Sequence, residues 1–158
     1  METTFATEIL LILQLLVALL LGMAIGTERS ISHKTAGMRT YGLVALGACL
    51  FIIISEIVAS TYLGMGANVA PLRVTASIVT GIGFIGAGAI LFRDHHLTGL
   101  TSAAGLWVAA GIGVAVGFGL YLVAVTTTVL TLATFTILWK LEERVRHLND
   151  DDRENDNK

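Results

Sequence analysis

The stretch from Leu97 to Trp139 contains no Asp, Glu, Lys or Arg, and this absence of charge is the strongest constraint on the fold. At about 1.5 Å per residue, one helix of this length would be about 65 Å long, twice the roughly 30 Å hydrocarbon core of a bilayer. We therefore expect two membrane-spanning helices here, which turn near Gly117-Phe118-Gly119.

Three further apolar stretches precede this region, each bounded by charged residues. They run from Ile9 to Thr27, from Tyr41 to about Leu63 and from Val74 to Phe92. Because a span needs about 20 apolar residues, the sequence predicts an all-α, polytopic bundle of about five membrane helices. The expected membrane domain covers residues 1–140, with spans at about 9–27, 40–62, 74–92, 99–117 and 120–139, and a hydrophilic cytoplasmic tail follows at 141–158, with a disordered end.

Composition excludes several classes of protein. Hydrophobic residues make up 54% of the chain and charged residues 14%, against about 25% charged in a typical soluble chain. The net charge of −2 and the lack of a basic patch exclude a nucleic-acid binder. The single cysteine, Cys49, excludes a disulfide scaffold and a multi-cysteine zinc site, and we expect it to be a packing residue of the second span.

The basic residues predict the orientation. With the first loop, the third loop and the tail inside, every Lys and Arg except Arg73 lies in the cytoplasm, as the positive-inside rule expects. The N-terminus is then outside and the C-terminus cytoplasmic, in the plasma (inner) membrane.

Gly81 to Gly86 match the G-x-G-x-x-G pattern of dinucleotide-binding loops. That function requires a preceding strand and an acidic residue about 20 positions later, and neither is present. Counting from Arg73, this segment falls near mid-membrane, where Gly81, Gly83, Gly86 and Gly88 favour close helix packing. The alternative is a locally broken helix whose free backbone groups bind an ion.

The fourth span independently favours close packing. Gly105, Ala109, Gly113 and Gly117 recur every four residues. Such rows mark tight helix contacts, either within one chain or between copies of a homo-oligomer.

Three segments carry a resemblance: Gly26 to Thr40, Gly81 to Gly88, and Gly99 to Val108. With these motifs in this order, the chain resembles the MgtC/SapB family of membrane proteins from about Gly22 to Tyr121. The resemblance implies a bundle of about five membrane helices, in agreement with the count from the apolar stretches.

The resemblance also implies a function. Members are bacterial proteins linked to magnesium limitation and, in pathogens, to survival inside host cells. It implies regulation of other membrane machinery, such as ATP synthase, rather than transport. Long members carry a soluble cytoplasmic domain, whereas only about 19 hydrophilic residues follow Trp139 here, and Met38 and Tyr41 stand where Leu and His are common.

Charged residues at the ends of the first two spans are candidates for interaction. Interfacial anchoring would direct Arg29 and Arg39 toward lipid headgroups. Alternatively, Arg39 holds Glu28 across the short hairpin, and the pair presents a cytoplasmic surface to a partner.

Glu56 lies about 24 Å along the second span from Thr40, near the outer edge of the hydrocarbon core. Charges there are costly and usually paired, and Arg73 is the expected partner. A structural role is favoured, with cation or proton handling as the alternative.

A metal site has little support in the sequence. His33, His95, His96 and His147 all fall on the predicted cytoplasmic side, but no His pair has the i, i+4 spacing of helical metal ligands. We expect no cofactor, with weak Mg²⁺ binding by the acidic tail as the alternative. No serine has a plausible base beside it, so an enzyme is not expected.

Two functional hypotheses remain. The first is a small, non-enzymatic membrane protein of MgtC/SapB type that modulates another membrane protein in the response to low magnesium. The second is a channel or carrier for Mg²⁺ or another cation, formed by the bundle or by an oligomer, with Glu56 and the Gly81–Gly88 segment on its path.

Overall fold

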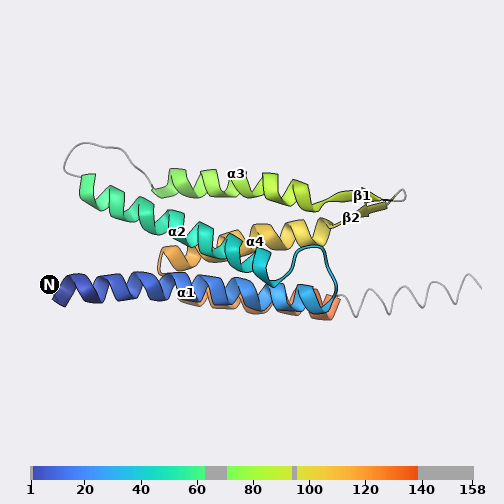
Figure 1. Ribbon diagram of the computed structural model, residues 1–158, viewed down its shortest axis with the longest axis horizontal. Helices are drawn as coiled ribbons and strands as arrows, with labels where there is room; N and C mark the ends of the chain where they lie inside the picture. The colour runs from blue at the N-terminus through green and yellow to red at the C-terminus, as the bar shows by residue number, and fades with distance from the viewer. Residues whose placement is uncertain (1, 63–70, 94–95, 139–158) are drawn as a thin grey trace, which may run out of the picture.

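The computed structural model describes residues 2–62, 71–93 and 96–138, and these form a bundle of long helices with one short hairpin (Figure 1). In chain order the elements are α1 (Glu2–Ile31), α2 (Met38–Tyr62), α3 (Pro71–Ala89), β1 (Leu91–Arg93), β2 (His96–Thr98), α4 (Leu100–Gly117), α5 (Tyr121–Ala133) and a π-helical turn, η2 (Thr134–Leu138).

The all-α fold class predicted from the sequence is confirmed. Four helices, α1 to α4, are long and apolar enough to cross a membrane, and the shorter apolar helix Tyr121–Ile137 follows them. Residue 139, the expected end of the fifth span, and the tail at 141–158 lie outside the described residues.

Two boundaries differ from the prediction. Helix α1 begins at Glu2 rather than near Ile9, so it extends beyond its apolar segment. Helix α3 ends at Ala89, and strands β1 and β2 pair antiparallel after it, with Phe92 opposite Leu97. Gly99 then joins the hairpin to α4 with φ of +89°, a left-handed conformation that glycine adopts at little cost.

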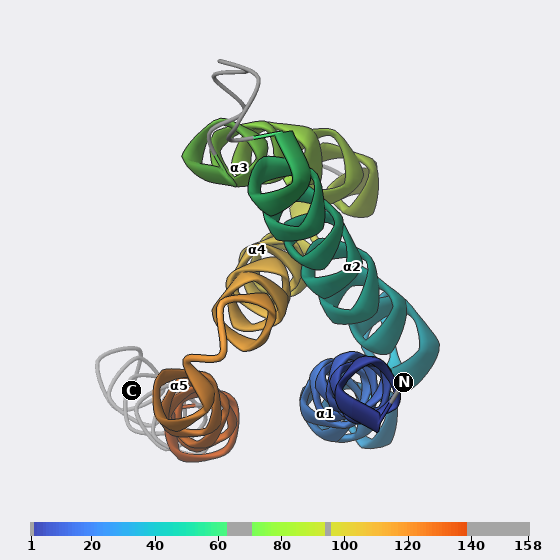
Figure 2. The ribbon, with the colours of Figure 1, turned by 90° about the vertical axis from the view of Figure 1, so that its left-hand side faces the viewer.

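Helix α4 lies inside the bundle. Viewed end-on, α3 lies at one edge and α1 and α5 at the other, with α2 and α4 between them (Figure 2). Helix α2 packs against both α1 and α4. The core between them includes the fully buried side chains of Tyr41, Cys49, Ile52, Leu106, Ile112 and Val116.

Glycines bring these helices together. A Cβ atom at Gly113 would overlap the carbonyl oxygen of Ala45, and one at Gly117 would lie 2.7 Å from Cβ of Ile52. Helix α2 therefore approaches α4 at a distance that only glycine permits.

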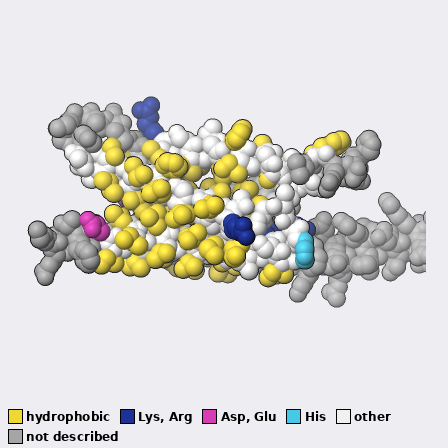
Figure 3. Space-filling view, viewed as in Figure 1, with side chains coloured by type: hydrophobic (Ala, Val, Ile, Leu, Met, Phe, Trp, Pro, Cys, Tyr) yellow, Lys and Arg dark blue, Asp and Glu magenta, His cyan; other side chains and the backbone are white. Residues whose placement is uncertain are grey.

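The outer surface of the bundle is apolar. Hydrophobic side chains spread over the middle of the face shown in Figure 3, while a carboxylate lies toward one end and a histidine toward the other. Large apolar side chains point outward from every long helix, among them Leu20, Leu43, Phe84 and Trp107. A surface of this kind fits contact with lipid chains, so we treat α1 to α4 as membrane-spanning.

Candidate functional site

The hairpin between α1 and α2 is held by its own polar groups. His33 adopts a left-handed backbone conformation with φ of 53°, and the Lys34 N–H donates to the Arg29 carbonyl at 2.9 Å. The Met38 N–H donates to the Ser30 hydroxyl at 3.1 Å. These bonds start α2 directly beside the end of α1.

Arg29, at the end of α1, is a buried charge, with 3% of its surface exposed. Its Nη1 atom lies 3.4 Å from Oε2 of Glu28, and its Cζ atom lies 4.2 Å from the centre of the Phe135 ring in η2. Glu28 also accepts a hydrogen bond from the Ser32 hydroxyl at 2.8 Å. The Nε atom of Arg29 is buried without a hydrogen-bond partner among the described residues. The carboxylate and the aromatic face together compensate the buried cation.

This geometry corrects two sequence-based predictions. Arg29 does not extend toward headgroups, because its side chain is enclosed by the bundle. Glu28 is paired with Arg29 and not with Arg39. Arg39 is exposed, and within the described part of the chain it forms no ion pair with Glu28.

Tyr41 and Gly105 complete the surroundings of Arg29. Tyr41 is fully buried, and its hydroxyl donates to the Ser102 carbonyl at 3.1 Å. A Cβ atom at Gly105 would overlap that hydroxyl and would lie 2.8 Å from Cζ of Phe135. We call Glu28, Arg29, Tyr41, Gly105 and Phe135 the Arg29 cluster. It joins α1, α2, α4 and η2 at one end of the bundle.

Sequence reasoning misses part of this cluster. Tyr41 is marked in the sequence only as a departure from the family pattern, and nothing marks Phe135. A buried arginine in an apolar setting favours an aromatic partner, but the sequence contains several aromatic residues that would satisfy this requirement.

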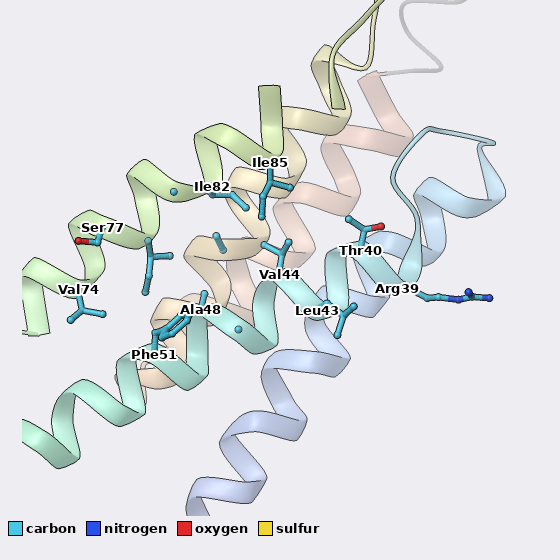
Figure 4. Close-up of a pocket in the computed structure, with 14 residues that line it drawn as sticks. Arg39, Thr40, Leu43, Val44, Ala48, Phe51, Val74, Ser77, Ile82 and Ile85 are labelled. Atoms are coloured by element: carbon cyan, nitrogen blue, oxygen red, sulfur yellow. The ribbon is translucent and has the colours of Figure 1, made fainter. Parts of the chain in front are cut away.

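A groove of about 640 Å³ lies between α2 and α3, and Ala110 of α4 contributes to its wall (Figure 4). Arg39 and Thr40 lie at the start of α2, and the Arg39 side chain extends away from the apolar residues. The other lining residues are nearly all apolar or small: Leu43, Val44, Gly47, Ala48 and Phe51 on α2, and Val74, Ser77, Ile78, Gly81, Ile82 and Ile85 on α3.

Glu56 and Arg73 are not brought together. Both side chains are exposed, and within the described part of the chain no ion pair joins them. The predicted Glu56–Arg73 pair is therefore wrong. Glu56 instead presents its carboxylate on the outer surface of α2.

The glycines of α3 and α4 differ in their surroundings. Gly105, Gly113 and Gly117 of α4 lie against neighbouring helices, whereas a Cβ atom at Gly81, Gly83 or Gly88 would meet nothing within 4 Å. A Cβ atom added at Gly86 would lie 3.7 Å from Cβ of Ala103, an ordinary van der Waals contact. Within one chain, the close packing predicted for the α3 glycines is thus wrong at Gly81, Gly83 and Gly88. Helix α3 is also continuous from Pro71 to Ala89, which contradicts a broken helix at Gly81–Gly88.

Metal ligands do not gather in the described part of the chain, where no group of three or more His, Cys, Asp or Glu side chains is placed to hold an ion. His33 is exposed in the hairpin after α1. His95 and His147 lie outside the described residues, as does the acidic tail.

The chain matches known proteins over most of its length. The MgtC family profile matches residues 15–144. The protein named "Putative magnesium transporter YhiD" of Escherichia coli K12 is 39% identical over 139 residues, which cover 87% of this chain and 65% of that protein. Protein MgtC of Salmonella typhimurium is 41% identical over 137 residues, 87% of this chain and 56% of that protein.

Protein MgtC of Brucella abortus is 43% identical over 121 residues, which cover 77% of this chain and 48% of that protein. The chain thus spans about half to two thirds of the length of these relatives. No solved structure matches it. The apolar helical bundle and the profile match agree, and the chain belongs to the MgtC family of multi-pass membrane proteins.

Proposed function

We propose that this protein is a non-enzymatic regulator of another membrane protein in bacterial magnesium homeostasis. The observation that carries the proposal is the polar chemistry of the bundle interior. Among the described side chains, Arg29 is the one buried charge, and it contacts Glu28 and the Phe135 ring while its Nε atom has no hydrogen-bond partner among the described residues. A helix bundle with this interior supports packing rather than ion passage.

The buried hydroxyl groups support the same conclusion. Ser55 donates to the Ile52 carbonyl at 2.8 Å, Thr128 to the Ala124 carbonyl at 2.9 Å, and Thr131 to the Thr127 carbonyl at 2.7 Å. These hydroxyls are therefore engaged by their own helices. Mg²⁺ prefers near-octahedral oxygen coordination and loses its water reluctantly, and no group of acidic side chains gathers among the described residues to replace that water.

The link to magnesium rests on the E. coli relative whose name describes a putative magnesium transporter. We place the protein in the plasma (inner) membrane with the α1–α2 hairpin and the C-terminus in the cytoplasm, on the distribution of basic residues. The family resemblance suggests ATP synthase as a candidate partner.

The deciding experiment is Mg²⁺ uptake into sealed proteoliposomes that contain a Mg²⁺-sensitive dye. We compare the wild-type chain, Glu56→Gln and empty vesicles, after checking that both proteins elute as folded species. We expect wild-type uptake equal to that of empty vesicles. Uptake above this level that is lost in Glu56→Gln would overturn the regulatory proposal.

That outcome would support the second candidate function, a cation pathway between copies of the chain. The observation in its favour is Glu56, a carboxylate exposed on the outer surface of α2 that forms no salt bridge within the described part of the chain. In an oligomer, several such carboxylates would face one another. A single chain offers no comparable row of ligands among its described residues.

A second measurement addresses the partner. A photoreactive amino acid at Lys34, exposed in the α1–α2 hairpin, is expected to crosslink one membrane protein in cells starved of magnesium. The same group at Ser60, exposed near the opposite end of α2, serves as the control. If ATP synthase is the partner, ATP-driven proton pumping by inverted membrane vesicles should change when the chain is removed. Unchanged pumping would exclude this partner.

A further inference from the structure

We propose that the groove between α2 and α3 binds an acyl chain of an anionic phospholipid from the surrounding bilayer, with the lipid phosphate at Arg39. This site is independent of the regulatory function proposed above. Three properties of the groove lead to it: its length, its lining and the charge at its end.

The length of the groove along α2 and α3 is close to the thickness of one leaflet of the hydrocarbon core. From Arg39 to Phe51 the lining extends over twelve residue steps along α2, about 18 Å at 1.5 Å per residue. On α3 it runs from Val74 to Ile85, about 17 Å. Half of a hydrocarbon core of about 30 Å is about 15 Å. A transmembrane helix of a partner would need a surface along the whole core, whereas a lipid chain occupies one leaflet.

The lining suits an alkyl chain. Ser77 is the main polar residue in the body of the groove, and its hydroxyl already donates to the Arg73 carbonyl at 3.0 Å. A Cβ atom added at Gly47 or Gly81 would meet nothing within 4 Å, which leaves room for the ligand between the two helices. The volume of about 640 Å³ lies within the range of small-molecule sites, about 300 to 1,000 Å³.

Arg39 supplies the charge complementarity. It is the second residue of α2, at the end where the groove begins, and it is exposed. Within the described part of the chain it forms no ion pair, in contrast to Arg29. Its side chain extends from the end of the groove (Figure 4), where a phosphate at headgroup level would lie. Basic groups between membrane helices bind anionic headgroups in this way.

The test uses the full chain in phosphatidylcholine vesicles with a trace of phosphatidylglycerol that carries a diazirine in mid-chain. After illumination, adducts are mapped by mass spectrometry, and a matched phosphatidylcholine probe gives the baseline. We expect about fivefold more adducts on the α2 and α3 groove segments from the anionic probe, the effect of one arginine near a headgroup.

Two arginine variants test the headgroup contact. Arg39→Gln should reduce the excess to the baseline, whereas Arg73→Gln, which removes an exposed arginine outside the lining, should retain it. An excess unchanged in Arg39→Gln, or lost equally in both variants, would overturn the proposal. Equal labelling by both probes in the wild-type chain would do the same.

Two glycine variants test the body of the groove without altering charge. Gly81→Leu fills the groove and should lower the anionic-probe adducts to the level of Arg39→Gln. Gly83→Leu, also open but outside the lining, should leave them unchanged. If Gly81→Leu instead converts dimers into monomers while the adducts remain, a second copy of the chain occupies the groove and the lipid proposal is wrong.

Discussion

Arg29 shows how a single residue can be both buried and charged in this bundle. An ionised side chain inside a membrane protein is costly unless it is paired. Here the compensation comes from two directions, the Glu28 carboxylate at 3.4 Å and the Phe135 ring at 4.2 Å. Because Phe135 belongs to η2, this contact ties the end of α1 to the last described turn of the chain.

A double-mutant cycle of Arg29→Met and Phe135→Leu measures the interaction energy between these two side chains. We expect a coupling energy of about 1–2 kcal/mol, the value for a desolvated cation–π pair. The free energy of unfolding is measured by denaturant titration in mixed micelles. Strictly additive losses would show that Phe135 only fills space.

At this scale the sequence predicts where the charges lie but not where their side chains point. Glu28, Arg29 and Arg39 are correctly expected at one hairpin. Arg29 turns inward onto Phe135, which lies far along the chain and itself packs against Gly105 of α4. Neither contact can be read from the local sequence around the hairpin.

Helix α4 shows what the small residues do within one element. Its glycines face different surroundings. Gly113 lies against the backbone of α2, where Ala45 supplies a carbonyl group that cannot move aside as a side chain can. Gly111, two residues earlier, has no atom within 4 Å of its Cβ position.

These two positions form a matched pair. Gly113→Ala should lower the free energy of unfolding by about 1–3 kcal/mol, because the added methyl group forces α2 away from α4. Gly111→Ala should leave it unchanged or raise it by up to about 1 kcal/mol, since alanine favours helix. Thermal unfolding in mild detergent compares them, and equal losses would contradict this account of α4.

The spacing of small residues therefore predicts tight packing along α4 but not its direction. A row of glycines permits close approach on its face without specifying that a neighbour is present. Helix α3 is also rich in glycine, yet Gly81 and Gly83 face open space within the chain. The difference arises from tertiary arrangement, because α4 is enclosed by other helices and α3 lies at the edge.

At the scale of the whole molecule, the number and order of the helices follow from charge-free stretches of membrane length. The β1–β2 hairpin does not, because Leu91 and Phe92 continue the apolar pattern of α3 and only their pairing with β2 separates them from it. The ends of α1 and α3 also differ from the predicted ends, because the residues there do not mark where a helix begins or stops.

The predicted orientation can be tested with single cysteines in a Cys49→Ala background, since Cys49 is fully buried. We expect Lys34→Cys to react with a membrane-impermeant maleimide only after cells are permeabilised, because the positive-inside rule places this hairpin in the cytoplasm. Ser60→Cys, near the other end of α2, should react in intact cells. The reverse pattern would invert the topology.

The turn between α4 and α5 has a consequence for biosynthesis. Only residues 118–120 separate the two helices, with Gly119 at φ of +72°, and none of them is charged. A connection of three uncharged residues contains no basic residue that could orient the neighbouring helices. It is also too short for α4 to insert as an independent span before α5 is synthesised. The two helices must leave the translocon as a hairpin, and their direction must be set by the segments on either side.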